Sequence, residues 1–172
     1  MSGYQIFIQS IALLALAGFA ASYHAKTRRG ILFIQVLSLC AWLIHFLLLS
    51  AWTGAMLNAI NIFITAAFLF KDKKIWVKSN YFFTSAILIL TAATAATWQG
   101  FFSLFALLGV YLATLARWQD KTKMIRFIAI FSGISWIVYD IFVGSYGGII
   151  AELVIIFSIM LSLMRKKFLM PL

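Results

Sequence analysis

Residues 38–58 read SLCAWLIHFLLLSAWTGAMLN, and residues 132–152, which lie 94 positions further on, read SGISWIVYDIFVGSYGGIIAE. The two stretches share a serine, a tryptophan and a glycine, which are the residues at positions 38, 42 and 54 of the first copy. They differ at the last position, where the first copy has Asn58 and the second has Glu152. A membrane chain with two like halves usually has its site where the halves meet. The repeat therefore predicts two similar units with a site between them.

The composition indicates the surroundings of the chain. Of its 172 residues, 65% are hydrophobic, 17% are aromatic and only 10% are charged. Soluble domains are about half apolar and about one quarter charged. The sequence therefore predicts an integral membrane protein with no additional soluble domain.

Apolar runs long enough to cross a hydrocarbon core of about 30 Å fill almost the whole chain. They are continuously apolar, whereas strands of a membrane barrel alternate apolar and polar positions. We therefore expect an all-helical membrane protein with seven transmembrane helices, at residues 4–23, 31–49, 54–70, 80–97, 100–116, 125–143 and 147–164.

The positions of the basic residues explain the net charge of +10. All 14 lysines and arginines fall into four groups, at residues 26–29, 71–78, 117–126 and 165–167. With seven spans these groups lie on one side of the membrane, and the connections on the other side contain none. The positive-inside rule then predicts an outer N-terminus and a cytoplasmic C-terminus. The lipid bilayer is the expected partner of this pattern, and nucleic acid is not.

Aromatic residues near the ends of the spans fit the belts that form at membrane interfaces. Three belong to the outer interface, Trp52, Trp98 and Tyr146, and three to the inner one, Tyr23, Trp76 and Trp118. Trp42 and Trp136 lie well inside their spans and need another explanation, either as pocket residues or as filling of the bundle core.

The repeat divides this single transmembrane domain of residues 1–172 into three parts. Shifting the chain by 94 positions places the fifth span on the first, the sixth on the second and the seventh on the third. Residues 4–74 and 100–167 are then two three-helix repeats of like orientation, and the span at 80–97 is a linker helix. Without a linker the second repeat would be inverted, because each repeat has an odd number of helices.

This plan, with an aromatic residue three positions after each tryptophan and a polar residue sixteen after it, resembles the SWEET, MtN3 and PQ-loop superfamily. Within it, residues 42–58 are most similar to the YgjV-like family of the bacterial inner membrane. The resemblance implies a solute pocket on a pseudo-two-fold axis, lined by Trp42, Asn58, Trp136 and Glu152. The chain departs from the superfamily in having no proline in its first or fifth span, since its only proline is Pro171.

The residues themselves also indicate a site. Side chains with polar groups recur at i, i+4 and i+7 on the second and sixth spans: Ser38, Trp42 and His45, then Ser132, Trp136 and Tyr139. Such stripes should face inward, because a surface in contact with lipid has no use for them. His45 has a second interpretation, as an interior histidine hydrogen-bonded to Asn58 or Ser38.

The four acidic residues fall into two classes. Asp72 and Asp120 lie among the basic residues of the predicted cytoplasmic loops, where solvated ion pairs are expected. Asp140 and Glu152 lie within spans, where a charged carboxylate costs about 2.5–3.5 kcal/mol. We hypothesise that Glu152, with Asp140 and His45, binds a proton or a cationic group of the substrate. Asp140 also has a simpler interpretation, because it lies about one turn from the outer end of its span and could reach water.

No enzyme is expected, because no serine shares a stripe with a base and an acid, and no glycine loop or metal-ligand cluster is present. The single Cys40 excludes an intramolecular disulfide. No cofactor and no metal are predicted.

The sequence therefore predicts a facilitator or proton-coupled carrier whose two repeats rock about a central pocket. Its substrate is a small solute that is sugar-like, nucleoside-like or amine-bearing. The alternative is a membrane protein that binds or assembles with a ligand, lipid or partner chain without transport. Two repeats in one chain allow a working monomer, and a homo-oligomer stays open.

Overall fold

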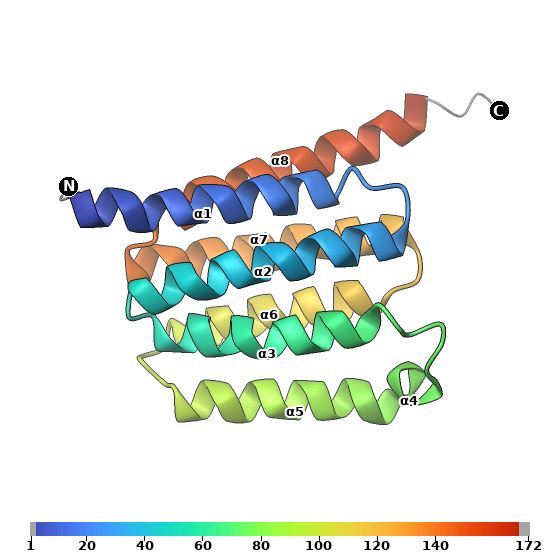
Figure 1. Ribbon diagram of the computed structural model, residues 1–172, viewed down its shortest axis with the longest axis horizontal. Helices are drawn as coiled ribbons and strands as arrows, with labels where there is room; N and C mark the ends of the chain where they lie inside the picture. Colours follow the sequence, from blue (N-terminus) through green and yellow to red (C-terminus); the bar gives the residue numbers. More distant parts are fainter. Residues whose placement is uncertain (1–2, 169–172) are drawn as a thin grey trace.

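The computed structural model describes residues 3–168, with side chains for residues 3–164. The basic group at residues 165–167 lies outside the described side chains, and Pro171 lies outside the described residues. Within this part the chain forms eight helices (Figure 1): α1 (Gly3–Ser22), α2 (Arg28–Leu48), α3 (Trp52–Phe68), α4 (Ile75–Lys78), α5 (Asn80–Ala96), α6 (Ser103–Trp118), α7 (Thr122–Val143) and α8 (Tyr146–Phe168).

The seven predicted spans coincide with the seven longer helices to within four residues at every end. Four of these helices, α1, α2, α7 and α8, are long and apolar enough to cross a membrane, and α3, α5 and α6 are shorter apolar helices. The single turn of α4 was not predicted. It forms in the second basic group because Val77 is fully buried while the flanking lysines, Lys74 and Lys78, remain exposed.

Local signals set several helix ends. The Thr27 side chain accepts a hydrogen bond from the Gly30 amide at the start of α2, and Ser79 accepts one from Tyr81 at the start of α5. Gly144 ends α7 with a φ of 69°, a left-handed conformation that glycine adopts without steric cost.

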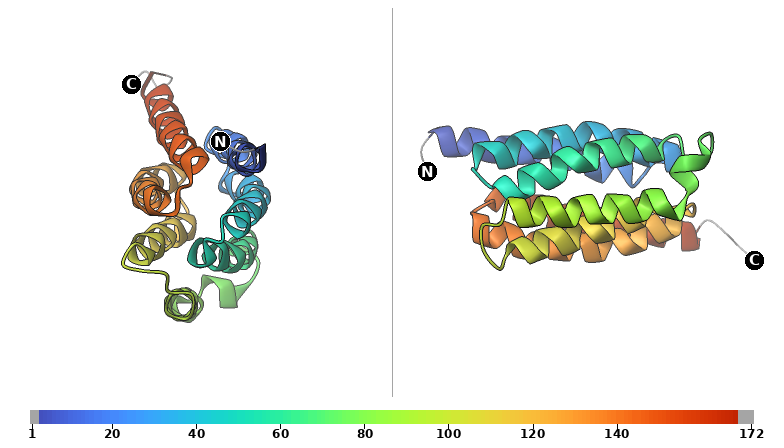
Figure 2. Two further views of the ribbon diagram at one scale, coloured as in Figure 1. Left: turned by 90° about the vertical axis from the view of Figure 1, so that its left-hand side faces the viewer. Right: turned by 90° about the horizontal axis from the view of Figure 1, so that it is seen from below.

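The long helices lie side by side with their axes roughly along one direction (Figures 1 and 2). In one set α1 packs on α2 and α2 on α3, and in the other α6 packs on α7 and α7 on α8. The two sets meet where α1 packs on α8 and where α3 packs on α6, while α5 packs on the outside of α3 and α6. Six helices therefore surround an interior. The internal repeat and the orientation in the membrane stay predictions.

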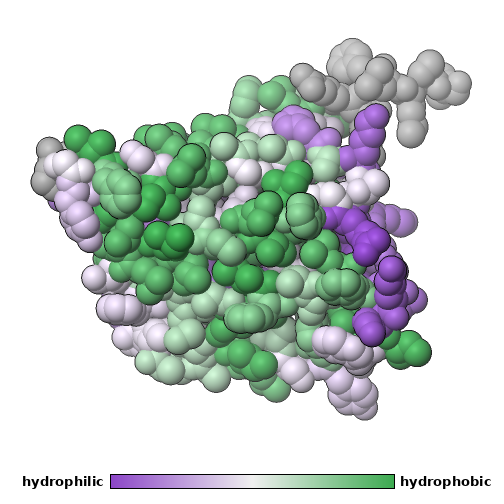
Figure 3. All heavy atoms as spheres, viewed as in Figure 1, coloured by the Kyte–Doolittle hydropathy of each residue, from purple (hydrophilic) through white to green (hydrophobic). Residues whose placement is uncertain are grey.

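Polar residues gather at one end of the bundle, and apolar side chains cover the middle of the face in Figure 3. This end, which we call the basic end, is formed by the basic groups at 26–29, 71–78 and 117–126. Arg28 ties the two helix sets together there through three backbone carbonyls. Its Nε donates to Gln119, its Nη1 to Phe68 and its Nη2 to Arg117, at 3.0, 3.1 and 3.0 Å.

Two further basic residues are buried at the basic end, where the sequence predicted solvated charges. Lys71, whose side chain is 6% exposed, forms a salt bridge of 3.0 Å with Asp120, which is 72% exposed. Arg126 donates through Nε to the Tyr23 carbonyl at 2.9 Å and through Nη2 to the Ala25 carbonyl at 3.0 Å. The first and second halves of the chain are thus bonded to each other at this end.

The opposite end, which we call the far end, is closed by contact between α1 and α8. Gln9 on α1 donates to the Gly144 carbonyl at 3.3 Å and accepts from the Gly147 amide at 2.7 Å. A Cβ at Gly147 would lie 2.8 Å from the Gln9 backbone oxygen, which is closer than real Cβ contacts. Glycine at 147 therefore sets how closely α8 approaches α1.

We predict that Gly147→Val destabilises the protein by about 1–3 kcal/mol, because the added side chain meets backbone that cannot move without separating α1 from α8. Thermal unfolding in detergent would measure this change. Gly3→Val is the matched control, since a Cβ there meets nothing within 4 Å. Equal stability of the two variants would contradict the close packing of α1 and α8.

Candidate functional site

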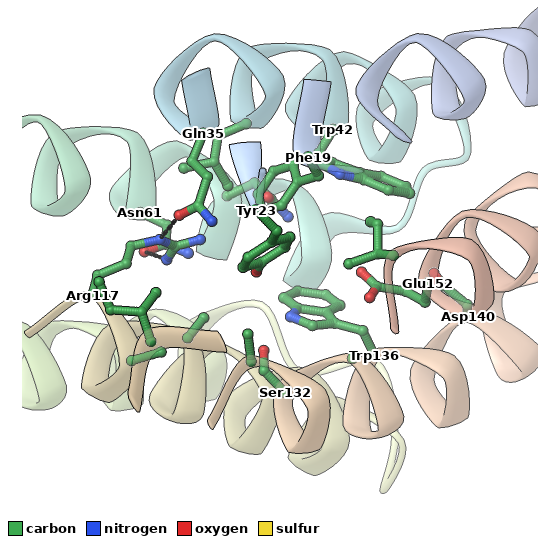
Figure 4. A pocket seen from close by; sticks show the side chains of 18 of the residues that line it. Phe19, Tyr23, Gln35, Trp42, Asn61, Arg117, Ser132, Trp136, Asp140 and Glu152 are labelled. Carbon is green, nitrogen blue, oxygen red and sulfur yellow. Dashed lines mark hydrogen bonds between the residues drawn. The ribbon is translucent and has the colours of Figure 1, made fainter. Parts of the chain in front are cut away.

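A cavity lies inside the ring of six helices, and every helix of both sets contributes to its wall (Figure 4). The space open to the centres of water-sized spheres is about 50 Å³. At about 10–15 Å³ for each water molecule, this space holds a few waters. The cavity is therefore polar enough and wide enough to be wet, and it is small in this conformation.

An aromatic stack joins α2 to α7 across the cavity. Phe46 stacks on Trp42 at 5.7 Å and 23°, and on Trp136 at 5.7 Å and 25°. Gly109 makes room for the Trp136 ring, because a Cβ at Gly109 would lie 2.9 Å from two of its atoms. Trp42 and Trp136 both line the cavity, and they also pack against the core. The two interpretations of these residues are thus compatible.

Two carboxyl groups face the cavity from α7 and α8. Asp140 is 1% exposed, and its Oδ1 has no hydrogen-bond partner among the described residues. Glu152 is half-buried and forms no hydrogen bond with residues 3–164. A Cβ at Gly133 would lie 2.8 Å from the Glu152 Oε2, so glycine at position 133 leaves the space that this carboxyl occupies. The simpler interpretation of Asp140, as a residue that reaches bulk water, does not match its burial.

The structure adds an arginine to the cavity that the sequence analysis assigned to a cytoplasmic loop. Arg117, in the last turn of α6, is 4% exposed and lines the cavity. Its Nε donates to Gln35 Oε1 and its Nη1 to Asn61 Oδ1, both at 2.9 Å. A sequence signal for its burial exists: Arg117 lies four residues after Ala113 and eight after Gly109, so it continues the small-residue face of α6.

Tyr23 also lies elsewhere than predicted. Its sequence position predicted a place in the aromatic belt at the inner interface, but Tyr23 is 5% exposed and lines the cavity. It lies between Arg117 and Glu152 in Figure 4. Tyr23 ends an apolar run in the sequence. Such a position indicates how deep a residue lies in the membrane, but not which way its side chain points.

Asn58 and Ser132, both predicted site residues, line the cavity with part of their polar groups already bonded. The Asn58 amide donates to the Gly54 carbonyl at 2.8 Å, and the Ser132 hydroxyl donates to the Gly109 carbonyl at 2.8 Å. The Asn58 carbonyl oxygen and the remaining lone pair of the Ser132 hydroxyl are left to accept hydrogen bonds. These residues could orient a bound solute or water.

Three other predicted site residues do not line the cavity. Ser38 donates to the Ile34 carbonyl within its own helix and packs against Gly18. His45 is fully buried, and its ring nitrogens contact the Ile8 carbonyl at 2.9 Å and the Ser145 hydroxyl at 2.8 Å.

The interior interpretation of His45 was therefore correct in kind but wrong in its partners, which are neither Asn58 nor Ser38. These partners come from α1 and from the turn before α8, so the sequence stripe could not indicate them.

Tyr139 is the third residue outside the cavity wall. It is fully buried, and its hydroxyl accepts from the Gly54 amide at 2.9 Å. Gly54 lies in the first turn of α3, whose N-cap residue, Ala51, has no side chain that can cap. Tyr139 therefore supplies an acceptor to an otherwise unpaired amide and links α7 to α3.

The cavity has an arginine nearer the basic end, two carboxyl groups on another side and aromatic rings between them. It offers hydrogen-bond donors, acceptors and apolar faces to a small solute. Among the described residues, no three His, Cys, Asp or Glu side chains lie close enough together to hold a metal ion.

We predict that Tyr139→Phe lowers stability by about 1–3 kcal/mol, because it leaves the buried Gly54 amide without an acceptor. Thermal unfolding in detergent would measure the loss. Tyr146→Phe is the control, because Tyr146 is 65% exposed. If Tyr139→Phe instead kept full stability and weakened the binding of a solute, Tyr139 would belong to the site.

Comparison with known proteins gives one finding. The model of the family Imp-YgjV, described as "Bacterial inner membrane protein", matches residues 6–168. No curated protein matches the chain, and no solved structure does so. The family match covers nearly all of the chain and agrees with its several long apolar helices. The chain belongs to the YgjV family of bacterial inner membrane proteins, and it is a multi-pass protein of that membrane.

Proposed function

We propose that this protein is a small-solute carrier of the inner membrane, and that its solute occupies the cavity between the two helix sets. The observation that carries the proposal is the presence of Arg117, Asp140 and Glu152 on one cavity inside an apolar bundle. Ionisable groups within a membrane bundle are costly, and they generally line paths for solutes, ions or protons. A bundle that only had to be stable would be better served by apolar residues there.

The packing favours a rocking motion. The two helix sets pack most closely along two seams, α1 with α8 and α3 with α6. Separation of the two sets at one end of the bundle, while they stay in contact at the other end, would expose the cavity to one side of the membrane at a time, as in other carriers with two repeats. The bonds at the basic end and at the far end are then the contacts that must break in turn.

The cavity must also widen for most solutes. Pockets for drug-sized ligands have volumes of about 300–1,000 Å³. The rings of Trp42, Phe46 and Trp136 occupy the space that a solute needs. We therefore expect these rings to move apart when solute enters, and we assign the present conformation to an occluded state.

The rival is a protein that binds or assembles without transport. Its support is that both ends of the bundle are bonded and that the cavity is small. Purified protein in liposomes, tested for uptake of a panel of solutes with and without a pH gradient, separates the two. Uptake above that of empty liposomes supports the carrier, and no uptake of any solute would favour the rival.

Proton coupling gives a sharper prediction. The titratable groups that face the cavity with Glu152 are Tyr23 directly after α1, Arg117 on α6 and Asp140 on α7. We expect Glu152→Gln to abolish the acceleration of uptake by a proton gradient, because the amide cannot exchange a proton.

Asp72→Asn is the matched control, because Asp72 is exposed and forms no salt bridge within the described part of the chain. It should leave the acceleration unchanged. A proton gradient that still drives uptake by Glu152→Gln would show that Glu152 is not the proton site.

A further inference from the structure

Arg117 is a buried cation without an anionic partner. Its two hydrogen-bond acceptors are the neutral amide oxygens of Gln35 and Asn61. A guanidinium has five N–H donors, and these bonds use two of them. Nη2 forms no hydrogen bond with any described residue, and Arg117 lines the cavity. An unpaired cation in an apolar bundle is costly, so this position favours an anion.

The two amides also fix how the guanidinium is presented. Gln35 comes from α2 and Asn61 from α3, and their bonds to Nε and Nη1 fix the orientation of the planar guanidinium. The N–H groups that remain are both of those on Nη2 and one on Nη1, and they can donate to the oxygens of a carboxylate. The cluster thus has the features of a built carboxylate site, with two neutral partners that orient the arginine without neutralising it.

The opposite side of the cavity has the complementary feature. The Glu152 carboxyl and the Asp140 Oδ1 have no hydrogen-bond partner within residues 3–164. In Figure 4, Glu152 and Arg117 lie on opposite sides of the cavity, with Tyr23 and Trp136 between them. The only salt bridge among the described residues is that of Lys71 with Asp120, so the opposite charges of the cavity do not pair directly.

We propose that the cavity binds a small zwitterion of the amino-acid class, with its carboxylate on Arg117 and its ammonium on Glu152. The inference rests on the proposed function, because it takes the cavity as the solute site. A neutral sugar would leave both charged groups unpaired, and a solute with one charge would leave one of them so. Trp136 adds an aromatic face that favours an ammonium group. The small cavity favours short side chains.

Binding to the unmodified, full-length protein in detergent tests the inference through matched ligands. The probes are glycine, alanine and serine, each compared with its amide, which lacks the carboxylate, and with the corresponding acid, which lacks the amine. ω-Amino acids of increasing length vary the separation of the two charges. Titration calorimetry should show at least tenfold tighter binding of the zwitterion than of either analogue. Equal binding of the singly charged analogues, or no binding of any zwitterion, overturns the inference.

Variants assign the two charges to residues. Arg117→Gln should bind the amino acid and its amide equally, and Glu152→Gln should bind the amino acid and the deaminated acid equally. Arg117→Lys keeps the charge but loses the planar group of five N–H donors, so it should lie between wild type and Arg117→Gln. Arg29→Gln removes an exposed charge from the same end and should bind as the wild type does. If Arg117→Gln does not fold, the ligand series on the wild type decides.

The outcomes separate this inference from the proposed function. Zwitterion binding without uptake into liposomes supports the inference and overturns the carrier. Uptake confined to solutes with one charge or none supports the carrier and overturns the inference.

Discussion

The structure depends on the constraint that hydrocarbon cannot hydrogen-bond. Each backbone amide and carbonyl must find its partner within the protein, which makes the chain helical, and each polar side chain must turn inward. The helix ends show the same constraint in detail. Tyr139 supplies the acceptor that the start of α3 lacks, and Gln9 bonds to both sides of the turn that joins α7 to α8. The polar cavity follows from this constraint too, because only the interior can accept Arg117 and Glu152.

The sequence was sufficient to predict where the helices lie, but not all of the contacts between them. Apolar length placed seven helices to within a few residues, because that signal is local. The family resemblance implied a pocket lined by Trp42, Asn58, Trp136 and Glu152, and the structure brings these four residues to one cavity. It could not show that His45 would bond to Ile8 and Ser145, since these partners depend on how α1 and α8 pack.

Arg117 shows the other way in which a sequence pattern misleads. The positive-inside rule uses the number of basic residues near a helix end and does not ask which way each side chain points. Arg117 belongs to a basic group at a helix end and still turns into the bundle. Arg126 and Lys71 are buried at the same end and bond to backbone carbonyls or to Asp120. The basic end is thus both a predicted topology signal and a set of bonds between the helix sets.

The cavity is asymmetric at positions where the two predicted sequence copies differ. Asn58 corresponds to Glu152, and Phe46 corresponds to Asp140. The first copy therefore supplies neutral amides and an aromatic ring, and the second supplies the acids. Arg117 belongs to the second half of the chain, but the amides that orient it, Gln35 and Asn61, belong to the first. A solute held between these groups would touch both helix sets, as coupling of its binding to their motion requires.

The central claim is that the cavity is a solute path and not part of a sealed core. It can be tested by replacing the lone Cys40 with serine and introducing Ser132→Cys, because Ser132 lines the cavity. In membrane vesicles of known orientation, a membrane-impermeant thiol reagent is added to either side. If the cavity is a solute path, the reagent labels Ser132→Cys from both sides, and a bound solute protects it. No labelling from either side would contradict a solute path through the cavity.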